Sequence, residues 1–148
     1  MPDQDPMQIE SVLEKLNVAL SLQHRSALEM TTIAGSLTGI EWHAIGGLLW
    51  SWATEELADT RRLVEKIVAL GGTPSTDTPS FEPVSSAAKA LETLVDHECE
   101  ALAAIHAVIP DTGQEPRSEA LEHRIEHIIM RKQEQIDTLY RLLGQTDT

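Results

Sequence analysis

The sequence predicts an all-α protein, a four-helix bundle in a single domain spanning residues 1–148. Two observations support this. Aromatic residues make up only 3% of the chain, whereas Ala, Leu, Glu and Ile are abundant, a mixture that favours helix over sheet. Four segments also carry apolar residues at helical spacing between recognisable start and stop residues. The helices are expected at about residues 7–36, 39–70, 85–109 and 116–143.

Each predicted helix has its own end signals. In the first helix, Asp5 can cap the N-terminus and Pro6 suits the first helical position. The second begins at a capping box, Thr38 to Glu41, and ends at Gly71 and Gly72. The third is expected to start near Ser85 or Ser86 and to stop before Pro110; the fourth starts near Pro116 and stops at Gly144.

The lengths of the connections predict the topology. The first and last connections are short, so they join antiparallel neighbours. The middle one, from Gly71 to Val84, contains three prolines and could reach roughly 45 Å at about 3.3 Å per residue. Because a helix of about 28 residues is roughly 42 Å long, we expect one long crossover that starts the third helix parallel to the second. The alternative is a loose loop between antiparallel neighbours.

Charge and composition exclude several classes of partner. A net charge of −13 offers no basic stripe for nucleic acid and would be repelled by an anionic membrane. The N-terminus does not resemble a signal peptide, and no apolar run approaches the roughly 20 residues of a membrane span. Cys99 is the single cysteine, which suits a reducing cytoplasm. We therefore expect a cytoplasmic protein that binds neither nucleic acid nor membrane.

Polar residues interrupt the apolar stripe of every predicted helix near its middle. Buried polar groups cost several kcal/mol unless they are satisfied, so their convergence in the core requires an explanation. The residues of this predicted core polar network are Gln23, Glu56, Asp59, Glu98, Lys132 and Gln135.

The pattern resembles the bacterioferritin branch of the ferritin-like family over nearly the whole chain. The similar segments are Leu16–Gln23, Glu55–Asp59, Ile67–Pro74 and Lys132–Leu139, together with Glu98. The resemblance implies a four-helix bundle whose core holds two irons between carboxylate and histidine ligands.

Most of the ligand positions that this resemblance implies carry other residues. Glu56 and Glu98 match the ligating glutamates of the family's second and third helices. By contrast, Gln23 stands at a ligating Glu, Asp59 at a His, Lys132 at a Glu and Gln135 at a second His. The spacing matches the family, whereas the chemistry of the site does not.

The charges of these residues favour a metal-free interpretation. Glu56, Asp59 and Glu98 bring three negative charges and Lys132 one positive charge, which leaves room for at most one divalent ion. We expect Lys132 to pair with Glu56 or Glu98, and the two glutamines to hydrogen-bond the remaining groups. Two alternatives stay open: one divalent ion on Glu56, Asp59 and Glu98, whose oxygens suit Mg, Mn or Ca better than iron, or a remodelled two-iron centre.

Two further residues concern haem and assembly. The family can hold haem through a Met that directly follows the ligating Glu of the second helix, which Glu56 matches. Leu57 occupies that position here, so haem is not supported. Trp50 lies seven residues before Leu57 on a face that does not point into the bundle. The resemblance places that face at a two-fold contact, so we expect a homodimer through Trp50 and Leu57. The chain ends soon after the fourth helix, so the short fifth helix of the family's 24-subunit shells is not expected.

Two functions are compatible with these residues. The preferred one is a non-catalytic ferritin-like dimer, without cofactor or catalytic residues, that has lost its di-iron ferroxidase centre and acts in a structural, regulatory or partner-binding role; the protein partner is unknown. The alternative is a metal-binding protein with a remodelled one- or two-metal site and ferroxidase-like or oxidative chemistry. Lys132 distinguishes them, because a lysine at a ligand position opposes metal binding.

Overall fold

The prediction of an all-α four-helix bundle is confirmed by the computed structural model, which describes residues 5–145. No strand occurs in that part of the chain. A short 3₁₀ turn, η1, lies between the last two helices. The helices are α1 (Ile9–Ser36), α2 (Gly39–Ala69), α3 (Ala87–His106) and α4 (Ser118–Leu142), and η1 spans Ile109–Asp111.

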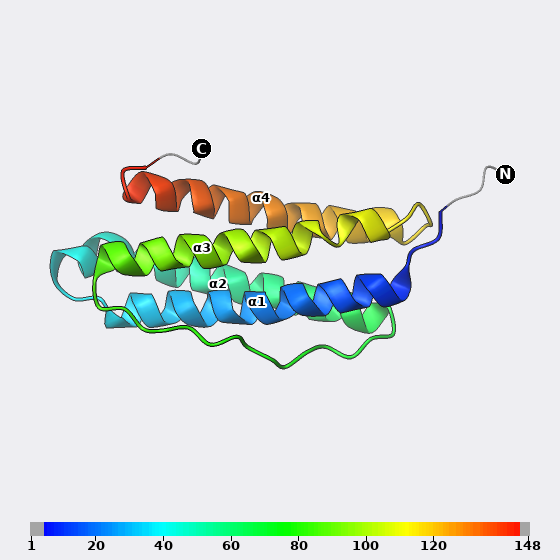
Figure 1. Ribbon diagram of the computed structural model, residues 1–148, viewed down its shortest axis with the longest axis horizontal. Helices are drawn as coiled ribbons and strands as arrows, with labels where there is room; N and C mark the ends of the chain where they lie inside the picture. The colour runs from blue at the N-terminus through cyan, green and yellow to red at the C-terminus, as the bar shows by residue number, and fades with distance from the viewer. Residues whose placement is uncertain (1–4, 146–148) are drawn as a thin grey trace.

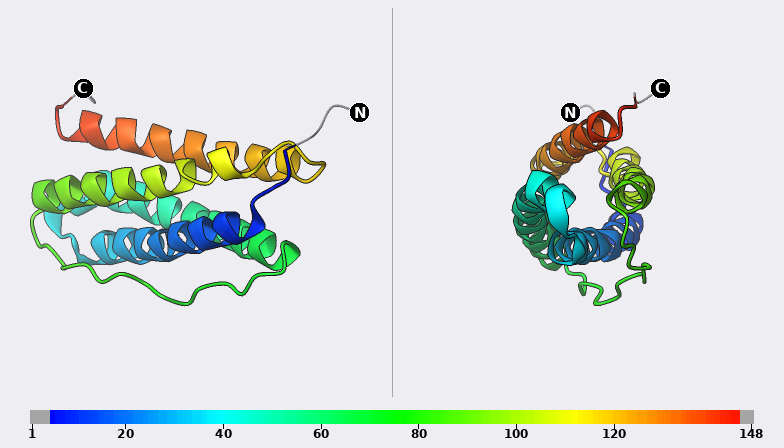
Figure 2. Two further views of the ribbon diagram at one scale, coloured as in Figure 1. Left: turned by 45° about the vertical axis from the view of Figure 1, so that its right-hand side comes forward. Right: turned by 90° about the vertical axis from the view of Figure 1, so that its left-hand side faces the viewer.

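The predicted long crossover is also present. Figure 1 shows α2 returning antiparallel to α1, and the segment 70–86 then running back along the whole bundle before α3 begins. As a result α3 is parallel to α2, and the alternative of a loose loop between antiparallel neighbours is wrong. The end-on view in Figure 2 shows a ring in which α1 lies diagonally opposite α4.

Hydrogen bonds from α1 fix the crossover to the bundle. The side chain of Asn17 donates to the carbonyl oxygen of Thr73 at 3.1 Å and accepts from the amide nitrogen of Ser75 at 2.7 Å. Further along α1, Nδ1 of His24 lies 3.2 Å from the carbonyl oxygen of Asp77. The crossover is therefore an ordered strap across α1.

The start of α1 differs from the prediction. The helix begins at Ile9 with Gln8 as its N-cap, so Asp5 does not cap it and Pro6 is not helical. The preceding segment is instead bonded to the loop between α3 and α4. The amide nitrogen of Met7 donates to Oε2 of Glu115 at 2.9 Å. Contacts with residues far away in the sequence replace the local cap.

The other helix ends show one further correction. Thr38 is the N-cap of α2, but its side chain makes no capping hydrogen bond, so the predicted capping box is not formed. At the other end, Gly71 has a φ of +85° and the amide nitrogen of Gly72 donates to the carbonyl oxygen of Ile67 at 2.9 Å. This closes α2 in a Schellman motif, for which glycine at the left-handed position is strongly preferred.

α3 and α4 are slightly shorter than predicted. α3 ends at His106 rather than 109, because the chain tightens into η1 before Thr112. α4 begins at Ser118 rather than 116, where Oγ of Ser118 accepts from the amide nitrogen of Glu115 at 3.0 Å and donates to the carbonyl oxygen of Thr112 at 2.5 Å. The loop is thus closed by side-chain hydrogen bonds that the sequence pattern did not indicate.

The apolar core divides into two clusters, one toward each end of the bundle. One contains residues such as Met30, Leu49 and Leu94, and the other contains residues such as Leu20 and Ile125. The polar residues at mid-helix lie between the two clusters. The fold therefore places a polar layer across the centre of an otherwise apolar bundle.

Candidate functional site

The centre of the bundle holds a buried charge cluster to which every helix contributes. We use this name for Gln23 of α1, Glu56 of α2, Glu98 of α3, and Lys132 and Gln135 of α4. Each of these side chains is at most 3% exposed. The sequence therefore brings polar groups from four separate helices into one buried layer.

Lys132 is the centre of this cluster. Its Nζ lies 2.5 Å from Oε2 of Glu98, and 3.2 and 3.3 Å from Oε1 and Oε2 of Glu56. The lysine is 1% exposed, so both ion pairs are removed from water. One ammonium group thus bridges two carboxylates from α2 and α3, which lie diagonally opposite each other in the ring.

The two glutamines behave differently from one another. Nε2 of Gln23 donates to Oε2 of Glu56 at 2.6 Å. The amide of Gln135, in contrast to the expectation, has no hydrogen-bond partner among the described residues at either Nε2 or Oε1. Oε1 of Gln23 and Oε1 of Glu98 are also buried without a partner in the same part of the chain. The cluster is therefore only partly satisfied by protein groups.

Asp59 does not join the cluster, although it is only 2% exposed. Its Oδ1 accepts from Arg62 at 3.1 Å, and its Oδ2 accepts from Arg131 at 3.0 Å. Three residues along a helix turn the side chain by about 300°, that is about 60° away from Glu56. That rotation directs Asp59 to the seam between α2 and α4, so the expected place of Asp59 in the central network is corrected.

Burial and ion pairing set the protonation of the cluster. Burial raises the pKa of Glu56 to about 7, although the charge of Lys132 and the hydrogen bond from Gln23 act in the opposite direction. For Lys132, burial alone would lower the pKa, but attraction by Glu98 and Glu56 outweighs it and raises the pKa. Lys132 therefore stays charged near neutral pH, while Glu56 is close to the midpoint of its titration.

The donor set does not fit two metal ions. Both glutamates that match family ligands are engaged by Lys132, and Asp59 is engaged by two arginines. An ammonium group this close to both glutamates would repel a cation strongly in a low-dielectric core. Across residues 5–145, no group of three or more His, Cys, Asp or Glu side chains is placed to hold a metal.

A second buried polar group was not predicted from the sequence. Glu29 of α1 is 3% exposed and its Oε1 lies 2.7 Å from Nδ1 of His97 of α3. Arg25, also buried, pairs with Glu100 at 3.0 Å. Burial raises the pKa of Glu29, with His97 and Arg25 counteracting it. The sequence feature that could have indicated the burial of Glu29 is its position seven residues after Leu22, which places both residues on the same buried side of α1.

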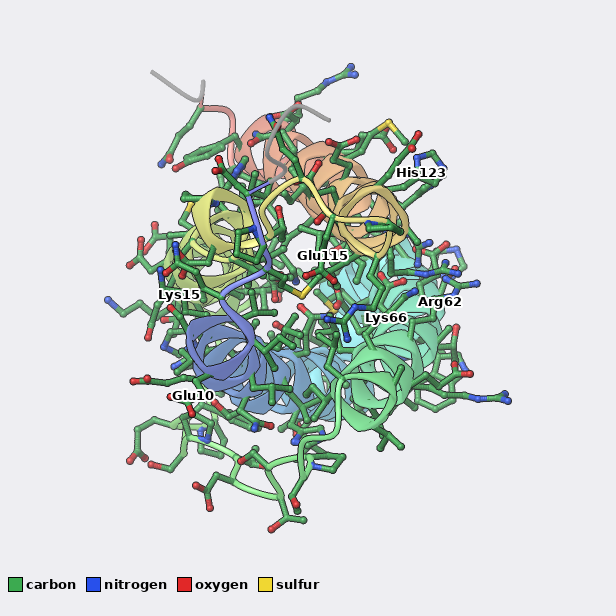
Figure 3. All side chains as sticks on the ribbon, turned by 90° about the vertical axis from the view of Figure 1, so that its right-hand side faces the viewer. Glu10, Lys15, Arg62, Lys66, Glu115 and His123 are labelled. Atoms are coloured by element: carbon green, nitrogen blue, oxygen red, sulfur yellow. The ribbon has the colours of Figure 1, made fainter. Side chains whose placement is uncertain are left out.

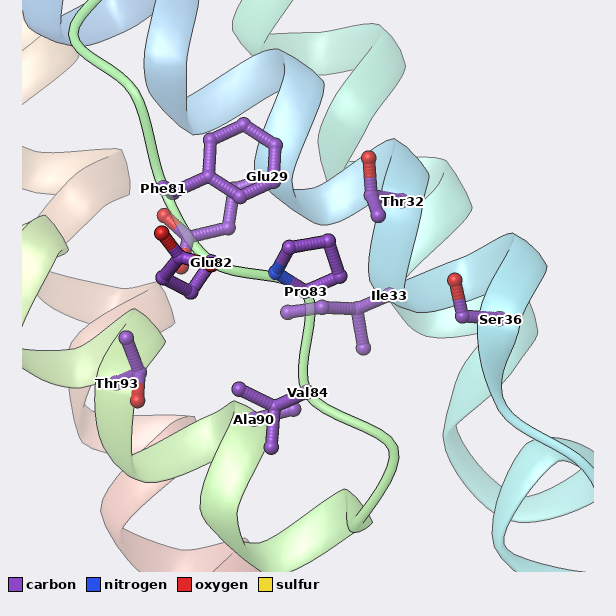
Figure 4. Close-up of a pocket in the computed structure, with 10 residues that line it drawn as sticks. All are labelled: Glu29, Thr32, Ile33, Ser36, Phe81, Glu82, Pro83, Val84, Ala90 and Thr93. Atoms are coloured by element: carbon purple, nitrogen blue, oxygen red, sulfur yellow. The ribbon is translucent and has the colours of Figure 1, made fainter.

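The crossover closes the surface above Glu29. Figure 4 shows Phe81, Pro83 and Val84 of the crossover packed between Ile33 of α1 and Ala90 of α3, beside Glu29. The cavity that remains has a volume of only about 10 Å³, close to the minimum for one water molecule. This region is a packing contact and not a ligand pocket.

The predicted dimer residues lie on the outer surface of α2. Trp50 is 54% exposed and Leu57 is 56% exposed. Trp42 is exposed to a similar degree and, with Trp50 and Ala34, lines a mostly apolar hollow of about 390 Å³. The face therefore carries several large apolar side chains in contact with solvent.

Comparison with known proteins identifies the fold family. A sequence model of the ferritin-like domain matches residues 13–148. No curated protein matches the sequence. None of the described helices is long and apolar enough to cross a membrane.

Three solved structures are similar to this chain. A ferritin-like diiron-carboxylate protein from Bacillus anthracis is 22% identical, with a TM-score of 0.85 over 91% of this chain and 96% of that one. Rhodobacter capsulatus bacterioferritin, described with a metal-free dinuclear site and haem iron, is 15% identical, with a TM-score of 0.76 over 91% and 84%. The bacterioferritin-related dodecameric thioferritin of Bacteroides fragilis is 18% identical, with a TM-score of 0.83 over 93% and 87%. At these identities the likeness establishes the fold.

Proposed function

The chain belongs to the ferritin-like domain family, and from this premise we propose that it has lost the family's di-iron ferroxidase centre. In this proposal it acts as a non-catalytic dimer with a structural, regulatory or partner-binding role. The observation that carries the proposal is the position of Lys132, whose Nζ bridges Glu56 and Glu98.

The charge cluster supports this proposal in two ways. Lys132 supplies the positive charge that the buried carboxylates would otherwise obtain from metal ions, so a metal would have to displace it. The histidine positions of the family's ligand set hold Asp59 and Gln135, and neither offers a nitrogen that can ligate a metal ion. Without soft or nitrogen ligands, the cluster lacks the donors that favour iron over Mg or Ca.

Iron loading tests the loss of the centre. The purified protein is incubated with ferrous iron, desalted and analysed for iron per chain, while the oxidation of the iron is followed optically. We expect no stoichiometric iron and no oxidation above the rate without protein. About two irons retained per chain would refute the proposal.

The proposed homodimer is supported by the exposed face of α1 and α2. Trp50, Leu57 and Trp42 are each more than half exposed, and apolar patches of this kind usually mark a contact surface. A two-fold contact would bury the face against its own copy. Light scattering of the wild-type protein should give twice the mass of one chain, 16.3 kDa. The mass of one chain, of a dodecamer or of 24 chains would contradict the dimer.

A second candidate function is the binding of one divalent ion by oxygen ligands. The specific observation in its favour is that Oε1 of Glu98 and Oε1 of Gln23 are buried acceptors without a partner among the described residues. Ligand binding to the folded state raises the melting temperature as ligand concentration increases. A concentration-dependent rise with Mn²⁺ or Mg²⁺ that is lost in Glu98→Gln would favour this candidate over the first.

We place the protein in the cytoplasm as part of the same proposal. The support is its single cysteine, Cys99, which suits a reducing compartment.

A further inference from the structure

We propose that a groove between α2 and α4, at the end of the bundle where α2 ends and α4 begins, binds a phosphate group. The groove is lined by Arg62, Glu65, Lys66, Ala69 and Arg124 and has a volume of about 270 Å³. We call it the cationic groove. This inference does not depend on the proposed loss of the di-iron centre, because the groove lies outside the buried charge cluster.

The charge of the cationic groove is opposite to that of the protein. The chain has a net charge of −13 with only 11 lysines and arginines, yet three of those cations line this one groove with a single acidic residue. Arg62 and Lys66 are visible from this end of the bundle in Figure 3, with His123 of α4 above them in the view. A local positive site in an acidic protein concentrates small anions, because the three cations that line the groove outnumber its one carboxylate, Glu65.

The cations of the cationic groove are only partly engaged by the protein. Arg62 donates to Asp59 at 3.1 Å, and Glu65 lies 3.8 Å from Arg61. Lys66 and Arg124 make no ion pair or side-chain hydrogen bond with any residue that the structure describes. Both are half-buried. Two partly desolvated cations that face one groove therefore keep free donors for an anion.

Helix electrostatics explains only one of these cations. Lys66 lies in the last turn of α2, where a positive charge interacts favourably with the helix dipole. Arg124 lies in the second turn of α4, which begins at Ser118, so its position near a helix N-terminus gains nothing from the dipole. The convergence of Arg124 with Lys66 and Arg62 is thus accounted for by a shared anion.

The size and chemistry of the cationic groove identify the class of ligand. Its volume lies just below the roughly 300–1,000 Å³ of pockets for drug-sized ligands, so a compact group fits best. Two guanidinium groups and one ammonium match the oxygens of a phosphate dianion, since arginine offers paired donors to phosphate. The same chemistry is presented by free phosphate and by the phosphate of a small monoester.

Calorimetric titration with inorganic phosphate tests the proposal. At low salt and neutral pH, the wild-type protein should bind phosphate with one saturable site per chain, and sulfate should compete for it. Sodium chloride at equal ionic strength should compete much less, because screening alone does not occupy the groove. A parallel titration with glycerol phosphate distinguishes the sources: tighter binding of the ester indicates a phosphorylated small molecule, and tighter binding of phosphate indicates the free ion.

Matched variants assign the binding to the cationic groove. Lys66→Gln and Arg124→Gln should each weaken phosphate binding about tenfold, because each removes a charge-assisted hydrogen bond to the anion. Arg124→Lys, which keeps the charge, should retain part of the affinity. Arg141→Gln removes the same charge from an exposed side chain in the last turn of α4 that does not line the groove, and should change the affinity less than about twofold.

Two results would overturn the proposal. One is the absence of saturable phosphate binding by the wild-type protein. The other is an equal loss of affinity in Arg141→Gln and Arg124→Gln, which would mean that phosphate responds to overall charge and not to the groove. Circular dichroism confirms that each variant is folded. The iron-loading experiment tests the proposed loss of the di-iron centre separately, and its outcome does not depend on phosphate binding.

Discussion

Replacing Lys132 by methionine should destabilise the protein strongly. The change keeps most of the volume of the side chain and removes the only ammonium in the buried charge cluster. Its Nζ lies 2.5 Å from Glu98 and 3.2 Å from Glu56. At an effective dielectric constant of about 20, these separations correspond to roughly 6–7 and about 5 kcal/mol of gross attraction.

The net effect is smaller than the gross attraction. Removing the lysine also removes the cost of burying its ammonium group, which is several kcal/mol. Breaking a buried pair by deleting one partner typically costs about 3–5 kcal/mol. For a domain of this size that corresponds to a melting temperature lower by about 6–20 °C.

The loss of stability in Lys132→Met should depend on pH. Without Lys132, the carboxylates of Glu56 and Glu98 remain buried and repel each other, but Glu56, whose pKa burial raises to about 7, can take up a proton. Protonation of Glu56 relieves about 1.4 kcal/mol per pH unit. Lys132→Met should therefore be more damaging at pH 8 than at pH 5.

Thermal unfolding followed by circular dichroism measures this effect, with protein concentration held fixed because an oligomer melts in a concentration-dependent way. Lys89→Met is the matched control: Lys89 is exposed on α3, so its loss should stay within about 0.5 kcal/mol. Adding Glu98→Gln to Lys132→Met should recover part of the stability, because one uncompensated charge is removed. If Lys132→Met melts like the wild type at pH 8, the inference that Lys132 balances the buried carboxylates is refuted.

The same contacts make three further outcomes testable. The pKa of Glu56 is raised from 4.5 to about 7, so its contribution to stability is present below pH 4.5 and is lost as pH rises through 7; wild-type stability should fall by up to about 3 kcal/mol over that window, and denaturant titrations should show a flatter pH profile for Glu56→Gln. Lys132→Glu with Gln135→His restores two ligand types of the family and should give a Mn²⁺-dependent rise in melting temperature that the wild type lacks. Trp50→Glu should place a charge in the proposed dimer contact and yield a folded monomer by light scattering; a variant that remains dimeric would move the contact to another face.

The fold could be predicted because its determinants are local or depend only on length. Gly71 stops α2 where the predicted helix ends, and its positive φ shows why glycine is needed there. The length of the crossover alone favoured a parallel third helix, and Figure 1 shows α3 running parallel to α2. The start of α1 was missed because Met7 is bonded to Glu115, a contact that no local pattern reveals.

The centre of the site was predictable for a related reason. A polar residue on the apolar stripe of a helix must be buried when the helix packs, so Glu56, Glu98 and Lys132 were candidates for one layer. The partners of a residue on the margin of the stripe depend on the rotation of the neighbouring helix. Asp59 meets Arg131 instead of the cluster for this reason, and the pair of Glu29 with His97 could not be read from either helix alone.

Lys132 has opposite effects on two properties: it stabilises the fold without metal, and it opposes metal binding. In the wild type, the ammonium group stabilises the apo fold by pairing with Glu56 and Glu98, and the same pairs withhold those carboxylates from a metal. A variant with Glu at position 132 reverses both effects: without metal it adds a buried negative charge to two others, and with metal it gains a ligand. Its folding should therefore depend on metal concentration, as RT ln(1 + [M]/Kd). Under the proposed loss of the di-iron centre, Lys132 would make the folded state independent of metal supply.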